Sequence, residues 1–219
     1  MSGYSLFLLK DMLKELGEDS TKNIVSSFLC PMNPDVENFL HFKAIEFERR
    51  GYATTYLVYA SYKQNPELAG YFSLAQKQFT IADKSVRAKS KTGKTQGLSK
   101  ALLKKIAKFG THDKKLGIHT IPAPLIGQLG KNYAVNGGRL ITGDELLKIA
   151  CDKVWEFQRL FSGRVVYLEC EDKPKLIDFY SENGFVEFGK RYLDPDENDV
   201  DGDYLVQMLK DLKAFYEKS

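Results

Sequence analysis

A strand, a capped helix and a second strand follow one another between residues 121 and 169, and this run constrains the fold more than any other feature. Residues 121–132 form an apolar stretch of strand length. Thr142 and Glu145 then form a capping box, which predicts that a helix begins there. Residues 164–169 are rich in β-branched residues and predict another strand. Two strands joined by one helix run parallel, with a right-handed crossover.

The rest of the chain places further elements on both sides of this unit. Apolar spacing predicts that the central helix buries one face, formed by Leu147, Ala150, Val154, Phe157 and Phe161. The other expected elements are a short helix or a strand plus helix over 5–16, a helix over 33–50, a hairpin of strands 54–62 and 68–82, a helix over 172–184, and strands 185–193 and 204–210.

This order of elements predicts a mixed α/β fold. The strands at the two ends of the sheet pair antiparallel, so the sheet is mostly antiparallel with a central parallel pair and has helices on both faces. We expect residues 1–219 to form a single domain, with a basic insertion at about 83–120 that lies over the core. The insertion includes a short basic helix over 98–109 and is too short and polar to bury a core of its own.

Charge is distributed unevenly, although the net charge is only +3. Residues 84–115 contain eleven lysines or arginines and one acid, Asp113, whereas residues 194–203 contain six acids and no base. Both segments are compatible with solvated surface. The alternative is that the basic segment attracts a phosphate-rich ligand, either coenzyme A or RNA.

Cysteine and histidine spacing gives no sign of a metal site or a disulfide. Cys30, Cys151 and Cys170 match no ligand framework and are interpreted as buried free thiols. The three histidines, His41, His112 and His119, show no metal spacing, so no metal is predicted. The sequence contains no signal peptide and no apolar run of 18 residues, which predicts a cytoplasmic protein without a membrane partner.

The loop before the central helix has the properties of a phosphate site. A helix N-terminus presents unpaired N–H groups and a partial positive charge. Gly137 and Gly138 allow close backbone approach, and Arg139 adds a permanent cation. Asp144 and Glu145 in the first turn oppose a phosphate. An ordinary capped helix after a flexible loop is the alternative interpretation.

Three motifs carry a resemblance to a known family. Residues 126–131 (Ile-Gly-Gln-Leu-Gly-Lys) lead into 138–147, and residues 175–185 (Lys-Leu-Ile-Asp-Phe-Tyr-Ser-Glu-Asn-Gly-Phe) end in Phe-Tyr-x-x-x-Gly-Phe. Together they resemble the acetyl-CoA-binding core of the GNAT superfamily of N-acetyltransferases. Residues 27–40 and 70–75 resemble the branch that contains toxins acting on aminoacyl-tRNA and phage-associated relatives.

One motif departs from the family pattern. The family's pyrophosphate loop reads Gln/Arg-x-x-Gly-x-Gly/Ala. In one alignment Gly143 takes the last place and Ile141 stands where a glycine is usual. In the other, Arg139 comes first, and Thr142 and Asp144 take the glycine places. The loop is degenerate in either alignment.

The resemblance implies transfer of an acetyl group from acetyl-CoA to an amine by direct attack, with acetyl-CoA as co-substrate and no metal. It implies that Tyr180 protonates the departing thiolate; a core aromatic is the alternative interpretation of this residue. Glu169, at a strand end, is a candidate base, and Glu171 is another. The expected donor-binding residues are Leu129, Gly130, Lys131, Gly138, Arg139, Leu140, Ile141, Thr142, Gly143 and Asp144.

The acceptor and the partners stay open at this point. An aminoacyl-tRNA, a protein amine and a small amine are all candidate acceptors. RNA is a candidate ligand of the basic segment 84–115, an antitoxin is a candidate partner, and a homodimer is a candidate assembly.

Two other function classes compete with this one. Residues 88–95 match a relaxed P-loop pattern, with Ala88 in place of the first glycine, which suggests a nucleotide-binding protein. The basic segment also suggests a non-catalytic RNA-binding module. Such a module needs exposed aromatics for stacking, and the segment contains only Phe109.

Overall fold

The computed structural model describes residues 3–83, 88–89, 95–194 and 202–217. Contacts divide the chain into two compact units. The first unit comprises Met1–Ala75 and Ile126–Ala150, and the second comprises Gln76–Leu125 and Cys151–Ser219. The single domain expected from the sequence stays a prediction.

The strands of the first unit pair in the order β1, β2, β3, β7. Strand β1 (Tyr4–Leu8) pairs antiparallel with β2 (Thr54–Tyr62), which forms the predicted hairpin with β3 (Asn65–Ala82). Lys63 and Gln64 both have positive φ and form the turn, so β3 begins at Asn65 and not at the expected residue 68. In the last part of β7 (Ile118–Lys131), the Asn132 N–H that follows the strand donates to the carbonyl of Ala69, 2.8 Å away.

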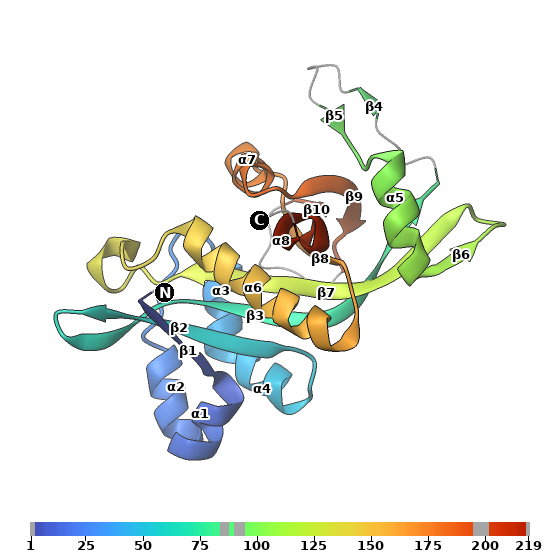
Figure 1. Ribbon diagram of the computed structural model, residues 1–219. Helices are drawn as coiled ribbons and strands as arrows, with labels where there is room; N and C mark the ends of the chain where they lie inside the picture. The colour runs from blue at the N-terminus through green and yellow to red at the C-terminus, as the bar shows by residue number, and fades with distance from the viewer. Residues whose placement is uncertain (1–2, 84–87, 90–94, 195–201, 218–219) are drawn as a thin grey trace. The chain divides into compact units, whose positions relative to one another are not determined.

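Helices cover one face of these strands (Figure 1). They are α1 (Leu9–Leu16), α2 (Glu18–Val25), α3 (Pro34–Asn38), the π-helical turn η1 (Phe39–Lys43) and α4 (Ala44–Arg49). Asn33 caps α3 as expected, because its side chain accepts a hydrogen bond from the Val36 N–H. The sequence predicted one continuous helix here and did not predict α2.

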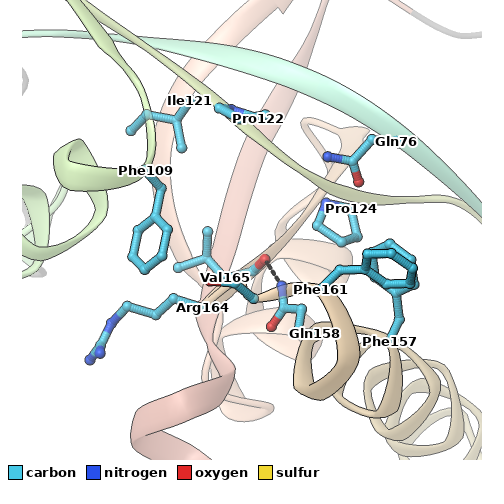
Figure 2. Close-up of a pocket in the computed structure, with 12 residues that line it drawn as sticks. Gln76, Phe109, Ile121, Pro122, Pro124, Phe157, Gln158, Phe161, Arg164 and Val165 are labelled. Atoms are coloured by element: carbon cyan, nitrogen blue, oxygen red, sulfur yellow. Dashed lines mark hydrogen bonds between the residues drawn. The ribbon is translucent and has the colours of Figure 1, made fainter.

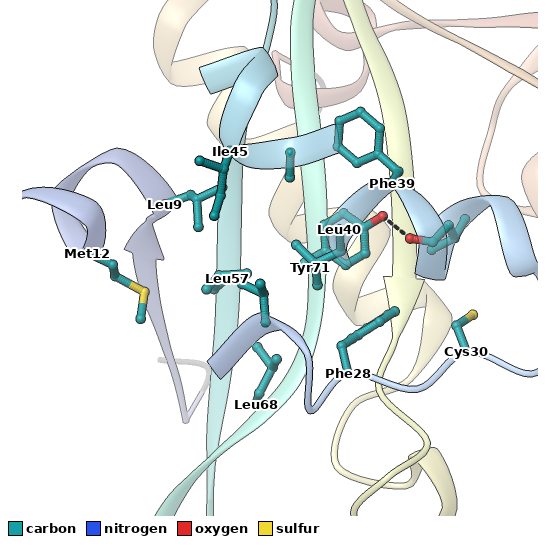
Figure 3. Packing of buried hydrophobic residues seen from close by; sticks show 13 residues of the cluster. Leu9, Met12, Phe28, Cys30, Phe39, Leu40, Ile45, Leu57, Leu68 and Tyr71 are labelled. Carbon is teal, nitrogen blue, oxygen red and sulfur yellow. Dashed lines mark hydrogen bonds between the residues drawn. The ribbon is translucent and has the colours of Figure 1, made fainter. Parts of the chain in front are cut away.

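The core of the first unit lies between these helices and the sheet (Figure 3). Phe28, Leu40 and Tyr71 are at most 1% exposed. The Tyr71 hydroxyl donates to the carbonyl of Val36, which satisfies the polar end of a buried ring. Gly70, the neighbour of Tyr71 in the strand, points to the opposite face, where the nearest side chain is Leu146 of α6 (Gly143–Phe161). Helices therefore cover both faces, as the sequence predicted.

The strands of the second unit pair in the order β3, β7, β8, β10, β9. Strands β8 (Val165–Glu171), β9 (Val186–Tyr192) and β10 (Tyr204–Asp211) agree closely with the expected ranges. Strand β10 pairs antiparallel with both β8 and β9, whereas β7 and β8 form the predicted parallel pair. The short strand β6 (Thr111–Asp113) pairs with the start of β7.

The basic insertion contributes to the core of this unit. Leu98, Leu103 and Ile106 belong to one buried cluster with residues of β3, β7, β8, β9 and β10. The last two come from α5 (Lys100–Ile106), which continues as the 3₁₀ turn η2 (Ala107–Phe109). The described part of the insertion thus contains the helix expected over 98–109, and its apolar residues pack in the core of this unit.

Alternation along β8 assigns side chains to the two faces of the sheet. Val165 and Tyr167 belong to the cluster with α5, so Val166, Leu168 and Cys170 point to the other face. Helix α7 (Pro174–Glu182) and the short α8 (Leu212–Tyr216) both contact β8. The sequence predicted α7 and did not predict α8.

One predicted helix face is wrong at its C-terminal end. Leu147, Ala150 and Val154 are buried, but Phe157 is 46% and Phe161 is 73% exposed. Gln158 is buried in their place, because its Nε2 donates to the Val165 carbonyl, 2.7 Å away. The two phenylalanine rings stack and line an open apolar hollow of about 400 Å³ in the second unit (Figure 2). Apolar spacing does not distinguish a core face from an apolar surface.

Candidate functional site

The predicted donor loop lies in the first unit, where β7 ends. A Cβ on Gly130 would lie 2.4 Å from Cγ1 of Val36, and one on Gly70 would lie 2.7 Å from the carbonyl oxygen of Gly130. Both glycines are therefore needed for strands β3 and β7 and helix α3 to pack this closely. Among the described strands of this unit, only β3 pairs with β7. The edge of Leu129–Lys131 that faces away from β3 therefore pairs with none of the described strands of this unit.

Asn132 fixes the chain where it leaves β7, a role that the sequence did not suggest. The side chain is buried, and its Nδ2 donates to the Leu68 carbonyl, 2.9 Å away. Its Oδ1 accepts from the N–H groups of Leu29 and Ala134, each 3.0 Å away. A buried amide with this many partners holds three segments in one arrangement.

The glycine-rich loop that follows is a 3₁₀ turn, η3 (Asn136–Gly138). Gly137 and Gly138 have φ of 58° and 74°, and a Cβ on Gly138 would lie 2.8 Å from the Tyr133 ring. Lys131 Nζ donates to the Gly138 carbonyl, 3.1 Å away, and lies over the Tyr133 ring. The lysine therefore ties the end of β7 to the loop.

The capping box forms as predicted at the start of α6. The Thr142 Oγ1 accepts from the Glu145 N–H at 3.1 Å, and Glu145 Oε2 accepts from the Thr142 N–H at 2.9 Å. The first of these bonds uses the Glu145 N–H, which lies just after the proposed phosphate cradle, and the second uses the Thr142 N–H, which belongs to it. The Arg139 N–H is also used, because it donates to Asn136 at 3.3 Å within the turn.

Three backbone donors of this loop stay available. Within the described part of the chain, the N–H groups of Leu140, Ile141 and Gly143 have no acceptor. Arg139 is exposed, and its guanidinium forms no ion pair with any described residue. Unpaired N–H groups in a loop that leads into a helix N-terminus, together with an exposed arginine of the same loop, are groups that can bind a phosphate.

An acidic side chain opposes this site, as the sequence suggested. Hydrogen bonds from the backbone and side chain of Thr142 lower the pKa of Glu145, which is therefore charged at neutral pH. The Tyr4 hydroxyl interacts with the same carboxylate. Burial, together with the hydrogen bond to Glu145 and the charge of Glu145, raises the pKa of Tyr4 to about 12. The Glu145 carboxylate thus accepts hydrogen bonds from the Thr142 N–H and the Thr142 hydroxyl, two donors that a phosphate would otherwise use.

Tyr180, the predicted acid, lies on α7 in the second unit and is 8% exposed. Its ring packs between Phe179 and Phe185, with centroid distances of 5.0 and 5.9 Å. Burial and the nearby Cys170 raise the pKa of the phenol well above 10, so the hydroxyl holds its proton at neutral pH. The hydroxyl has no hydrogen-bond partner in the described chain, which leaves it able to donate.

Glu169, the predicted base, is engaged by other side chains. Arg191 Nε donates to one oxygen at 2.6 Å, and Gln207 Nε2 donates to the other at 2.8 Å. Gln207 pairs directly with Glu169 across β8 and β10. The carboxylate has to lose a donor before it can accept a proton, so this arrangement suits a cross-strand anchor better than a base.

The structure does not bring these two residues together. Alternation along β8 places Glu169 on the face of Val165 and Tyr167, whereas the influence of Cys170 on Tyr180 places the phenol on the opposite face. Glu171 Oε1 accepts from Lys173 Nζ at 2.8 Å, so the alternative base is also paired.

The rival P-loop does not have the expected local structure where it is described. Ala88 and Thr95 belong to strands β4 (Ala88–Lys89) and β5 (Thr95–Gln96), which pair antiparallel with each other. A P-loop joins a strand to a helix that begins at its Lys-Thr pair, whereas α5 begins only at Lys100. Residues 84–87 and 90–94 of the basic segment, and residues 195–201 of the acidic segment, lie outside the described residues.

Comparison with solved structures identifies the architecture. A tyrosine-to-phenylalanine mutant of KacT superimposes with a TM-score of 0.60 at 17% identity, over 100% of both chains. AtaT complexed with acetyl-methionyl-tRNAfMet gives 0.61 at 16% identity, over 98% of each chain. A mutant AtaT toxin bound to the C-terminus of the antitoxin AtaR and acetyl-CoA gives 0.53 at 13% identity, over 99% of this chain and 98% of that one.

The chain has the GNAT fold.

The GNAT fold agrees with the sheet predicted from the sequence. No protein-family model matches the chain, and no curated protein matches it in sequence. Among the described helices, none is long and apolar enough to cross a membrane.

Proposed function

We propose that this protein transfers an acetyl group from acetyl-CoA to an amine. The observation that carries the proposal is a loop in which the N–H groups of Leu140, Ile141 and Gly143 have no acceptor among the described residues, and which also contains the exposed cation of Arg139. In a GNAT fold, this loop precedes the helix that the resemblance assigns to the pyrophosphate. An AtaT structure that contains acetyl-CoA supports acetyl-CoA as the donor.

The residues present fit the donor only in part. Three backbone donors and one cation remain for the pyrophosphate, whereas Thr142 and Arg139 use their N–H groups internally. The charged Glu145 weakens the field at the helix N-terminus. We therefore expect donor affinity in the micromolar range, below that of a loop with all its N–H groups free.

The transfer requires few groups of the protein. Acetyl-CoA supplies an activated thioester; the acceptor nitrogen forms a bond to the acetyl carbon, the carbon–sulfur bond breaks, and the nitrogen loses a proton to water. We assign Tyr180 to donate its phenolic proton to the departing sulfur and to regain a proton from water, because the hydroxyl is protonated and has no described partner. We assign Glu169 to hold β8, β9 and β10 in register, since Arg191 and Gln207 occupy its oxygens.

We propose an aminoacyl-tRNA as the acceptor. Lys104, Lys105 and Lys108 are exposed on α5 and η2, and such a group of cations attracts a polyanion. An AtaT structure holds an acetylated methionyl-tRNA, which supports this class of acceptor. An antitoxin partner is proposed on the AtaT–AtaR structure, while a homodimer and a cytoplasmic location rest on the sequence prediction alone.

An assay of acetyl transfer from radiolabelled acetyl-CoA tests both the proposed acetyltransferase activity and the proposed aminoacyl-tRNA acceptor. The acceptors are total aminoacyl-tRNA, deacylated tRNA, a protein lysate and a set of small amines. We expect label on aminoacyl-tRNA and none on deacylated tRNA. Label on protein or small amines alone would keep the acetyltransferase and reject the acceptor. Absence of label on every acceptor, with the donor bound, would contradict the enzymatic proposal.

A further inference from the structure

Asp83, His112 and His119 converge at one corner of the second unit. The His112 Nε2 lies 3.1 Å from Asp83 Oδ2, and the His119 Nε2 lies 3.1 Å from Asp83 Oδ1. One ligand atom from each residue lies within 4.8 Å of the other two. The sequence did not predict this group, because the spacing of the histidines matches no metal motif.

Strand pairing creates the cluster. His112 and His119 are direct partners across β6 and β7, and their rings stack with centroids 4.1 Å apart. Asp83 directly follows the last residue of β3, and its N–H donates to the Gly117 carbonyl, 2.8 Å away. Gly117 has φ of 63°, and a Cβ there would lie 3.3 Å from Asp83 Oδ2, so the glycine also leaves room for the carboxylate.

We propose that Asp83, His112 and His119 bind a divalent transition-metal cation of the Zn²⁺ class. Two imidazole nitrogens and a carboxylate oxygen are a ligand set that this class of cation prefers. Tetrahedral Zn²⁺ with ligands at about 2.0–2.1 Å keeps neighbouring ligand atoms roughly 3.3 Å apart. The two 3.1 Å separations join the imidazoles to different oxygens of Asp83, so the side chains have to rotate to bring one oxygen and both nitrogens to that spacing. Three protein ligands leave a fourth position for water.

The charged residues next to the cluster determine its expected affinity for a cation. Lys114 and Lys115 follow His112 in the β6–β7 turn and are exposed, so they weaken attraction for a cation. Asp113 does not add a ligand, because its Oδ1 accepts from the N–H groups of Lys115 and Leu116 at 2.8 and 3.1 Å. A three-ligand site that is partly exposed and beside two lysines should bind in the micromolar range.

The site joins the two ends of the basic insertion. Asp83 precedes residues 84–111, and His112 follows them. A cation that links these two ends offsets the entropic cost of closing the long loop between them. Because the cation binds only the folded arrangement, it stabilises the second unit. The cation would thus anchor the segment that carries Lys104, Lys105 and Lys108.

Histidine-selective NMR of the wild-type chain tests the proposal without any substitution. The protein has only three histidines, and His41 is a built-in control because its Nε2 donates to the Phe28 carbonyl, 2.9 Å away. After treatment with a chelator, one equivalent of Zn²⁺ should shift the ring signals of His112 and His119 and leave those of His41 unchanged. Equal shifts of all three, or no shift at 1 mM Zn²⁺, would overturn the site.

Calorimetry and Co²⁺ absorption with matched variants provide the second arm. Asp83→Asn, His112→Gln and His119→Gln should each weaken Zn²⁺ binding at least about tenfold and remove the visible Co²⁺ bands, whereas His41→Gln should bind as the wild type does. Zn²⁺ should also raise the melting temperature of the wild type and not that of His119→Gln. Binding that survives all three substitutions would assign the cation to another place and reject the proposal.

Discussion

At the scale of single residues, Tyr180 has the properties of a proton donor. It is buried, its pKa is raised, and its hydroxyl has no described partner. These properties come from packing between Phe179 and Phe185 and from the nearby Cys170. A sequence motif predicts the tyrosine, and the fold separates it from Tyr167, which is also buried with a raised pKa but points to the other face of the sheet.

Tyr180→Phe should lower kcat by roughly 10²–10⁴-fold, the usual contribution of general acid catalysis, with little change in the Kd of acetyl-CoA. The substitution removes only the donated proton and keeps the ring that packs in the core. Tyr167→Phe is the matched control, since Tyr167 is a buried tyrosine of β8 on the other face of the sheet. Turnover in Tyr180→Phe equal to that of the control would remove Tyr180 from the mechanism.

Gly130 is the residue at which packing next to the donor loop is tightest. Gly130→Ala should reduce the free energy of unfolding by about 1–3 kcal/mol, because the new methyl group overlaps Cγ1 of Val36. The measurement is urea denaturation followed by circular dichroism. Gly3→Ala has no atom within 4 Å of the added carbon and should change stability by less than about 0.5 kcal/mol. Equal stability of both variants would show that β7 and α3 can separate freely.

At the scale of elements, the capping box links the start of α6 to pH. A carboxyl group with a lowered folded pKa stabilises the protein above its unfolded pKa, and this contribution is lost as the pH falls through the folded pKa. The pKa of Glu145 lies below its ordinary value of 4.5. The stability difference between the wild type and Glu145→Gln should therefore be constant from neutral pH to about pH 5.5 and shrink below 4.5. Denaturant unfolding at several pH values measures it, and a difference that does not change with pH would contradict the proposed charge.

Local chemistry explains which elements could be predicted. Asn33 and the Thr142–Glu145 pair are short-range signals, and both caps formed as expected. Phe157 and Phe161 have the correct spacing for a buried face, but Gln158 takes the buried position through its bond to Val165. Helical spacing predicts which residues share a face, but it does not predict whether that face packs against the core or is exposed to solvent.

Long-range contacts explain what could not be predicted. Asn132 organises the donor loop through Leu29 and Leu68, residues far from it in the chain. His112 and His119 become neighbours only through the register of β6 with β7. The engagement of Glu169 by Arg191 and Gln207 likewise depends on the pairing of three strands. Such contacts depend on strand register, which has no local signature in one sequence.

At the scale of the whole molecule, one chain carries the proposed donor loop, the proposed proton donor and the basic surface of α5 and η2. The double variant Lys104→Glu/Lys108→Glu should raise the KM for aminoacyl-tRNA and reduce its salt dependence by about one unit of slope per lost phosphate contact, with the Kd of acetyl-CoA unchanged. The same i,i+4 reversal on α1, Lys10→Glu/Lys14→Glu, is the control. Equal KM values for the two variants would exclude the surface of α5 from acceptor binding.

The measurement that tests the central claim most directly is calorimetric titration of the purified protein with acetyl-CoA, with ATP titrated in parallel. We expect micromolar binding of acetyl-CoA at one site and none of ATP. Arg139→Gln should weaken acetyl-CoA binding about tenfold, because it removes the free guanidinium of the loop. Arg159→Gln, an exposed arginine in the last turn of α6, should not weaken it. Binding of ATP alone, or of neither ligand, would contradict the proposal that this GNAT fold uses acetyl-CoA.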